Sequence, residues 1–417
     1  MSQRHVALIR SVVMTACILF LATAALGDEV RPGIHRLHGV YAVLPTDDLE
    51  PVAAVIGDAP VVALGESYHT SGGFYRLKYR IFRYLVEEKG FRAFAMESPW
   101  DYAESVVEYV ETCEGSPEEA LKGLFGVWQS ESVRDLVRWM CVWNHRHPDD
   151  RVHFFGFDEQ QAELDGPALK KHLERFGLKA DDPRVQGIDR CDQNPRFQGL
   201  SDSDFNECMK RLDQLWNFFD RRERQIIRRT SAEELAWARI RLVGLRAWQY
   251  HHYRWSRARA YTARDEAMAH IFLAIRNLRF PGIKTVIWAH NGHIARKRNE
   301  LSSFLPMGSF LADVLGDDYI SLALIADEVG LDWPGLHCGT YDRPRWLNSV
   351  EDRLARLGEP YLFVDLDFPG TTSPFLEPGQ LYGIGWTGST VVCDQWDGIF
   401  YLDYSPPMVP LAWEPCQ

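Results

Sequence analysis

The chain has 417 residues, 46% of them hydrophobic, and a formal net charge of −12. An acidic chain of this kind is a poor partner for nucleic acid, so we expect no nucleic-acid binding. Its length allows two or three domains of ordinary size, with enough apolar residues to form cores without a structural metal.

The first 27 residues have the pattern of a secretory signal peptide. Arg4 and Arg10 come before an apolar stretch over 12–26. This stretch leads through Ala25-Leu26-Gly27 to two acidic residues. An uncleaved anchor is the alternative interpretation. We therefore expect a secreted or periplasmic protein, with no stable membrane span once the signal peptide is removed.

Four short apolar runs predict strands of a mostly parallel sheet, because longer helical patterns separate them. The runs cover 60–64, 91–96, 152–157 and 285–289, and each is followed by ionisable or amide side chains: Glu66 and His69, Glu97, Asp158, and His290, Asn291 and His293. Ligands of such sheets bind beyond the carboxyl ends of the strands. We therefore expect these side chains to share one catalytic edge.

The segment after the first predicted strand has the pattern of a helix that Gly72 and Gly73 open and Gly90 closes. Lys78 lies within its apolar stripe. There it could neutralise Glu66 or Glu97, or stabilise a developing oxyanion. The alternative is that its stem packs against the core while its ammonium group reaches water.

Helical spacing with few strand signals marks residues 169–280, and strand patterns resume after them, including 319–325 and 361–364. The predicted fold class is α/β, with a mostly parallel central sheet flanked by helices. Residues 28–168 and 281–417 are expected to form this discontinuous core. Residues 169–280 are expected to form an inserted all-helical lobe.

The chain has eight cysteines and no CxxC pair, which argues against a structural zinc site. In an oxidising compartment some cysteines could form disulfides. Cys191 with Cys208 is the first pair that we expect, because the two residues flank one short polar segment. Signal cleavage would leave an odd number of cysteines, so at least one thiol is expected to stay free or to pair between chains.

Glu66 and His69 are three residues apart on a predicted loop. A carboxylate at this spacing can fix the tautomer of an imidazole and prepare it as a general base, although the two could also form an ordinary loop pair. The residues from His290 to His293 suit substrate positioning, proton transfer or metal ligation. Alternatively, one of these histidines caps the following helix, and a strand-end Asp158 could also be a cap.

Several motifs occur in a fixed order over residues 60–330. They are Leu64-Gly65-Glu66-Ser67 with His69, Phe94-Ala95-Met96-Glu97, Phe155-Gly156-Phe157-Asp158, Arg264-Asp265-Glu266, and Trp288-Ala289-His290-Asn291-Gly292-His293. With these motifs the chain resembles the erythromycin esterase family. It departs from the family pattern at Lys78, where members that open macrolides more typically have arginine, and at Gly73, where a glutamate often follows the histidine motif.

The resemblance implies an ester or lactone hydrolase, since the family is described as opening the macrolide lactone ring. It also implies a histidine general base with supporting glutamates and no metal or other cofactor. Carried over to this chain, His69 is the base, Glu66 and Glu97 orient the imidazole and the water, and His290 assists.

The predicted protein is thus an exported hydrolase with a small-molecule ester or lactone substrate. Its expected catalytic residues are His69, Glu66, Glu97, His290 and Lys78, and its expected substrate-binding residues are Asn291, His293 and Asp158. Two alternatives remain open at this point. The same cluster could hold a catalytic metal, or the chain could be a non-catalytic envelope binding protein.

Overall fold

The computed structural model describes residues 29–192, 201–253, 257–298, 304–333, 337–341, 349–368, 379–381 and 388–414. The predicted signal peptide, residues 1–27, lies outside these ranges. Within them, no helix has both the length and the apolar character needed to cross a membrane.

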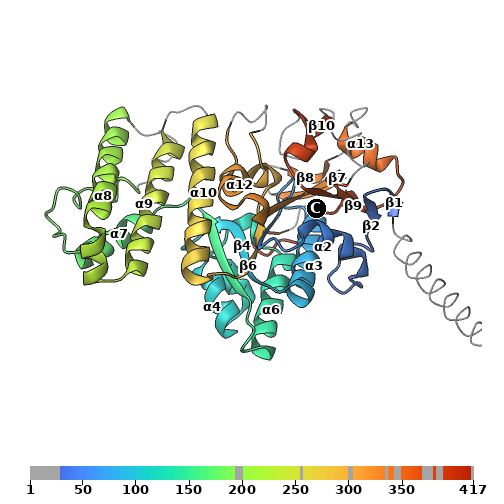
Figure 1. The fold of residues 1–417 in the computed structure, drawn as a ribbon, viewed down its shortest axis with the longest axis horizontal. Helices are drawn as coiled ribbons and strands as arrows, with labels where there is room; N and C mark the ends of the chain where they lie inside the picture. Colours follow the sequence, from blue (N-terminus) through green and yellow to red (C-terminus); the bar gives the residue numbers. More distant parts are fainter. Residues whose placement is uncertain are drawn as a thin grey trace, which may run out of the picture.

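Ten strands of the described chain form one mostly parallel sheet (Figure 1). They are β1 (Glu29–Arg31), β2 (Ile34–Arg36), β3 (Val61–Leu64), β4 (Phe91–Pro99), β5 (His153–Asp158), β6 (Lys284–Trp288), β7 (Tyr319–Trp333), β8 (His337–Tyr341), β9 (Tyr361–Asp365) and β12 (Gly398–Ser405). The order is β1-β2-β9-β12-β7-β3-β6-β4-β5, and β8 pairs with β7. Strands β12 to β5 of this order run parallel, whereas β9 and β8 pair antiparallel with their neighbours. The predicted α/β class and all six predicted strands are confirmed.

The register of the central strands aligns the points where they end. Leu64 of β3 pairs with Trp288 of β6, which pairs with Met96 of β4, and Met96 pairs with Gly156 of β5. The residues that follow each strand therefore meet at one edge of the sheet, as parallel pairing requires.

Both faces of the sheet are covered, because successive strand residues point to opposite sides. Val62 and Leu64 face one core and Val61 and Ala63 the other. The first core also contains side chains of α2 (Glu50–Ile56), α3 (Gly72–Lys89), α4 (Glu104–Thr112), α5 (Pro117–Leu121) and α6 (Glu131–Arg146). The second contains those of α10 (Arg257–Arg279), α12 (Met307–Leu315) and α13 (Val350–Ala355), on the opposite side of the sheet in Figure 1.

Helix α3 has the predicted bounds. It begins at Gly72, and Gly90 ends it with a φ of 73°. This left-handed conformation, which glycine adopts without steric penalty, closes the helix as its sequence indicated.

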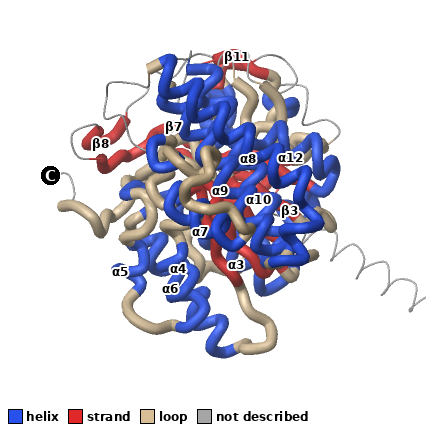
Figure 2. The backbone as a smooth tube through the Cα atoms, turned by 90° about the vertical axis from the view of Figure 1, so that its left-hand side faces the viewer, coloured by secondary structure: helices blue, strands red, loops and turns tan. Residues whose placement is uncertain are grey.

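A helical lobe lies beside the sheet, and Figure 2 shows it in front of the strands. Its helices α7 (Asp165–Arg175), α8 (Asp202–Arg229) and α9 (Ala232–His252) enclose their own apolar core. The predicted disulfide between Cys191 and Cys208 is present in this lobe. A second disulfide, Cys113–Cys141, is also present, a pairing that the sequence analysis did not name.

The structure corrects the predicted lobe boundary. Helix α10 falls within residues 169–280, but its apolar side chains, such as Met268, Ile271 and Phe272, pack into the core of the sheet. The helix therefore joins the sheet to the lobe, with α9 on its other side (Figure 1). Periodicity alone could not separate these roles, because α10 has the same helical pattern as its neighbours.

Buried carboxyl groups lie where the lobe meets the sheet. Glu159 follows β5 and Asp165 begins α7, and both are fully or almost fully buried. A Cβ added at Gly244 of α9 would lie 2.6 Å from Glu159 Oε2 and 2.7 Å from Asp165 Oδ2, so α9 closes directly over the pair. Arg241 donates to Asp165 Oδ1 at 2.8 Å. Burial, and then the nearby Asp165, raises the pKa of Glu159 well above its ordinary value.

We expect Glu159→Gln to stabilise the fold increasingly as the pH rises. Because the folded pKa of Glu159 is raised, the folded state holds more protons than the unfolded state above about pH 4, and stability falls with rising pH. The amide carries no charge and removes this loss. Urea unfolding should show little difference below pH 4 and a more stable variant at pH 8. The gain should be about 1.4 kcal/mol for each pKa unit by which the folded value exceeds the unfolded one, up to pH 8.

The exposed Glu174 of α7 provides the control. Glu174→Gln should leave the pH dependence of unfolding unchanged. A Glu159→Gln difference that did not grow with pH would contradict a protonated Glu159 in the folded protein.

Candidate active site

The structure places all five residues that were expected to be catalytic at the carboxyl edge of β3, β6 and β4. They are Glu66, His69, Lys78, Glu97 and His290, and each of them contacts at least one other member or its backbone. However, most of these side chains are buried, so they differ in their access to solvent.

His69 and Glu66 form a hydrogen-bonded pair. The His69 Nδ1 atom lies 3.0 Å from Glu66 Oε1. Since a carboxylate accepts, Nδ1 carries the proton and Nε2 presents a lone pair. Glu66 is fully buried, whereas 28% of the His69 side chain is exposed. Nε2 has no protein hydrogen-bond partner in the described chain, so it is free to take a proton from an approaching group.

Lys78 contacts the other oxygen of the same carboxylate. Its ammonium group donates to Glu66 Oε2 and to the Ala289 carbonyl at 3.2 Å, and it lies 4.5 Å from the centroid of the Trp288 ring. The side chain is fully buried. The structure therefore supports the expected neutralisation of Glu66. The alternative of an ammonium in water is wrong, because the side chain is fully buried, whereas the expected contact with an oxyanion stays a prediction. Burial lowers the pKa of Lys78 to about 8, and Glu66 opposes this shift.

Glu97 belongs to a second buried charge network. Arg264 of α10 donates to Glu97 Oε1 at 2.9 Å and, through two nitrogens, to both oxygens of Asp158 at 2.9 and 2.8 Å. The backbone N–H of His290 donates to Glu97 Oε2 at 2.8 Å. Although burial would raise it, the pKa of Glu97 lies far below its usual value, because His293, His69 and Arg264 surround the carboxylate.

Arg264 was not predicted as a site residue. It occurred in a motif of the family resemblance, but its position within a long helix gave no spacing signal that linked it to strand ends. The structure brings it to Asp158 although the two are 106 positions apart in the chain. Only the family motif could have indicated it.

His293 connects the same network to Asp265. Its Nδ1 lies 2.8 and 2.9 Å from the two oxygens of Asp265, and Arg264 lies 3.1 Å from its Nε2. The Met307 backbone N–H donates to Asp265 at 2.8 Å. The imidazole thus joins α10, α11 (Asn291–Ile294) and α12 beneath the edge of the sheet.

His290 is the N-cap of α11. Its Nδ1 accepts the Gly292 N–H at 3.1 Å, and its Nε2 donates to the Ser67 carbonyl at 3.0 Å. Burial, and then the neighbouring His69 and His293, lowers the pKa of His290 to about 3. The capping alternative is therefore the one observed. Both ring nitrogens are engaged, so His290 holds the loop that carries His69, and its expected catalytic role stays a prediction.

The three residues expected to bind substrate do not have free polar atoms. Asn291 is fully buried, and its amide exchanges hydrogen bonds with the Leu324 backbone at 2.9 and 3.2 Å. Asp158 is also fully buried and pairs with Arg264, and His293 is 8% exposed. Direct substrate contact by these three residues therefore stays a prediction that the observed burial and bonding do not support. All three support the exposed edge from below.

The donor atoms of the site do not converge as a metal-ligand set would. Both oxygens of Glu66 are bonded to His69 and Lys78, and both of Glu97 to Arg264 and the His290 backbone. Cations that already compensate these carboxylates leave little reason for a bound divalent ion. The donor set therefore fits a metal poorly.

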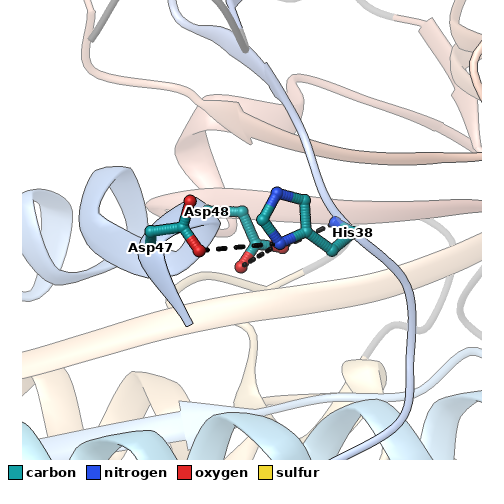
Figure 3. A group of neighbouring side chains, drawn as sticks. All are labelled: His38, Asp47 and Asp48. Atoms are coloured by element: carbon teal, nitrogen blue, oxygen red, sulfur yellow. Dashed lines mark hydrogen bonds and ion pairs between the residues drawn. The ribbon is translucent and has the colours of Figure 1, made fainter. Parts of the chain in front are cut away.

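Elsewhere in the described chain, His38, Asp47 and Asp48 have ligand atoms close enough to share an ion (Figure 3). Asp48 is already paired with Arg80 of α3 and accepts the His38 backbone N–H at 2.6 Å. This group anchors the N-terminal segment to α3.

We expect Arg264→Met to lower the free energy of unfolding by about 3–5 kcal/mol, because it leaves Glu97 and Asp158 buried without their cation. Urea unfolding measures this. Arg279→Met in the same helix is the matched control: the Arg279–Glu104 pair is exposed, so its loss should cost less than about 1 kcal/mol. Equal effects of the two substitutions would show that the buried network does not depend on Arg264.

The comparisons with known proteins agree with this architecture. The family model of erythromycin esterase matches residues 86–403. Erythromycin esterase type II of Escherichia coli is 24% identical over 311 residues, which cover 67% of this chain and 71% of that protein.

Two solved structures share the fold. A Bacillus cereus protein, Q81BN2_BACCR, superposes with a TM-score of 0.76 at 21% identity, covering 89% of this chain and 95% of that one. A mutant of the erythromycin esterase EreC in its open conformation superposes with a TM-score of 0.71 at 16% identity, covering 89% and 97%. Because the family model covers well over half of the sequence, the predicted resemblance is confirmed and this chain belongs to the erythromycin esterase family, a family of hydrolases.

Proposed function

We propose that this protein is an exported hydrolase that cleaves an ester or lactone by direct attack of water, with His69 as the general base. The observation that carries the proposal is the Glu66–His69 pair. The Glu66 carboxylate is buried and paired with Lys78, and the His69 imidazole is partly exposed, with no partner for its Nε2 among the described residues.

The first step follows from this geometry. Nε2 of His69 removes a proton from water as the water oxygen attacks the carbonyl carbon of the substrate. The imidazolium that forms is stabilised by the negative charge of Glu66, which accepts its Nδ1–H. Collapse of the tetrahedral intermediate breaks the bond to the leaving oxygen, and the proton on Nε2 passes to that oxygen. His69 thus returns to its neutral form.

The other residues act through this pair. Lys78 donates to the Glu66 carboxylate from the buried side, and His290 holds the Ser67 carbonyl. Trp128 lies against His69, with its ring centroid 5.0 Å from that of the imidazole in an edge-to-face arrangement. Glu97 lies beside the same loop. Together these contacts restrict the imidazole to the orientation in which Nδ1 bonds to Glu66 and Nε2 has no partner among the described residues.

Export is supported by the N-terminal pattern of charge and apolar residues. The two disulfides within the described chain, Cys113–Cys141 and Cys191–Cys208, are also typical of an oxidising compartment. The proposed substrate class, an ester or lactone, is supported by the family and by the name of the Escherichia coli relative.

The direct test is a hydrolysis panel of carboxylic esters and lactones, including a macrolide, run with and without a chelator. Turnover that persists after chelation supports attack by His69-activated water. Turnover that is lost on chelation and restored by a divalent metal would favour the metal-dependent alternative. Retention of a ligand without any turnover would favour a binding protein.

His69→Ala is expected to reduce kcat by about 100- to 10,000-fold, the usual contribution of a positioned general base. Circular dichroism should show an unchanged fold. His270→Ala, at an exposed histidine of α10, is the control and should retain turnover. Wild-type turnover in His69→Ala would remove this residue from the mechanism.

Turnover should decline as the pH rises above about 8, and Lys78→Arg should move that decline to higher pH. Lys78 loses its proton near this pH and no longer compensates Glu66, whereas a guanidinium stays charged. Unfolding does not explain such a decline: the folded pKa of Lys78 is below its unfolded value, so its deprotonation makes the fold more stable from about pH 8 to 10.4. Identical pH–rate profiles for the two proteins would contradict this role.

A further inference from the structure

Thr70, the residue after His69, has an unusual backbone conformation. Its φ is 63°, in the left-handed region, and the residue is 1% exposed. Few residues other than glycine adopt this region, and β-branched residues do so least readily. Such outliers persist only where surrounding contacts enforce them. The loop that carries His69 is therefore held in a conformation that it would not adopt by itself.

Two hydrogen bonds enforce this conformation, one on each side of Thr70. Its N–H donates to the Tyr75 hydroxyl at 2.9 Å, and its carbonyl accepts the Met408 N–H at 2.8 Å. The Tyr75 hydroxyl in turn donates to the Val127 carbonyl at 2.9 Å, which fixes its orientation. Tyr75 is fully buried, so no water competes for its hydroxyl.

The residues that supply the second bond belong to a segment that we call the C-terminal clamp, residues 405–411. The clamp crosses the start of α3: the Pro406 carbonyl accepts the Gly72 N–H at 2.7 Å, and Ser405 Oγ accepts the Phe74 N–H at 3.2 Å. It thus caps α3 with groups from a distant part of the chain, where a local side chain would ordinarily do so.

The two glycines that open α3 are explained by this crossing. A Cβ at Gly72 would lie 2.6 Å from the Pro407 carbonyl oxygen, and one at Gly73 would lie 2.4 Å from Ser405 Oγ. A larger residue at either position would displace the clamp. The departure from the family pattern at Gly73 therefore coincides with the place where the clamp contacts the helix.

We infer that Thr70 is a positioning residue for His69, held in the left-handed conformation by Tyr75 and by the C-terminal clamp. This inference rests on the proposed function, since it concerns how the general base is aimed. Rotation of residue 70 to a negative φ would turn the adjoining peptide and carry the imidazole away from Glu66 Oε1. The two hydrogen bonds prevent this rotation, so Nδ1 remains on Glu66 Oε1.

The test is a double-mutant cycle of Tyr75→Phe and Thr70→Gly. Tyr75→Phe removes the hydroxyl, and we expect kcat to fall by about 10-fold with little change in KM, because a left-handed threonine that is no longer held is sparsely populated. Thr70→Gly alone should lower kcat by less than about 3-fold, since glycine adopts positive and negative φ about equally. For the same reason Thr70→Gly should rescue Tyr75→Phe to within about 3-fold of the wild type.

Rescue separates positioning from packing. If Tyr75 only fills space, removing a methyl-bearing side chain at position 70 cannot restore kcat, so absence of rescue would overturn the inference. Wild-type kcat in Tyr75→Phe would also overturn it. Tyr84→Phe is the matched control: Tyr84 lies in the same helix, but its hydroxyl donates to Glu50 at 2.9 Å, far from the loop. It should leave kcat unchanged.

A structural measurement keeps the inference independent of the proposed reaction. Crystal structures should show a negative φ at residue 70 in Tyr75→Phe and a positive φ, with Nδ1 again near Glu66 Oε1, in the double variant. If the wild type hydrolyses no ester, the proposed function fails, but these structures still decide the role of Thr70. If Tyr75→Phe does not fold, Met408→Pro provides a second variant, because it removes the hydrogen bond to the Thr70 carbonyl. Thr70→Gly should then rescue the kcat of Met408→Pro in the same way.

Discussion

The candidate active site depends on one buried carboxylate, that of Glu66, which is shared between a lysine and a histidine. A buried carboxylate is strongly unfavourable unless a cation and hydrogen bonds compensate it. Lys78 supplies the cation from α3, and its ammonium is held in place by the Ala289 carbonyl and the Trp288 ring at the end of β6. The orientation of His69 therefore requires that two strands and one helix be in register. The parallel sheet provides that register.

On the other half of the edge, a second network also pairs buried carboxylates with a buried cation. Arg264 compensates Glu97 and Asp158 and thereby ties α10 to the ends of β4 and β5. The two networks meet where Glu97 accepts the backbone N–H of His290, whose side chain supports the loop after β3. Most ionisable groups at this edge thus act as buried supports. The imidazole of His69, by contrast, is partly exposed.

The sequence predicted the strand ends well, because a β-rich apolar run that stops at a charged residue reports both the sheet and its edge. It also placed Lys78 inside the apolar stripe of its helix. The sequence could not identify the hydrogen-bond and ion-pair partners of these side chains. Asn291 has the look of a ligand-binding amide at a strand end, yet it bonds to the backbone of β7. Arg264 lies within a helix whose periodicity does not distinguish the face toward the lobe from the face toward the sheet. The Cys113–Cys141 disulfide depends on how α4 packs against α6, which no local pattern encodes.

The C-terminal clamp determines how much of the chain must be present before the loop that carries His69 can take its native shape. The serines that meet at the start of α3, Ser71 and Ser405, are 334 positions apart, so the loop beside them acquires its native shape only after nearly all of the described chain has been synthesised. Contacts of such long sequence separation also form late in folding. A nascent or C-terminally clipped molecule would hold its carboxylates and its imidazole but lack the final constraint on the loop.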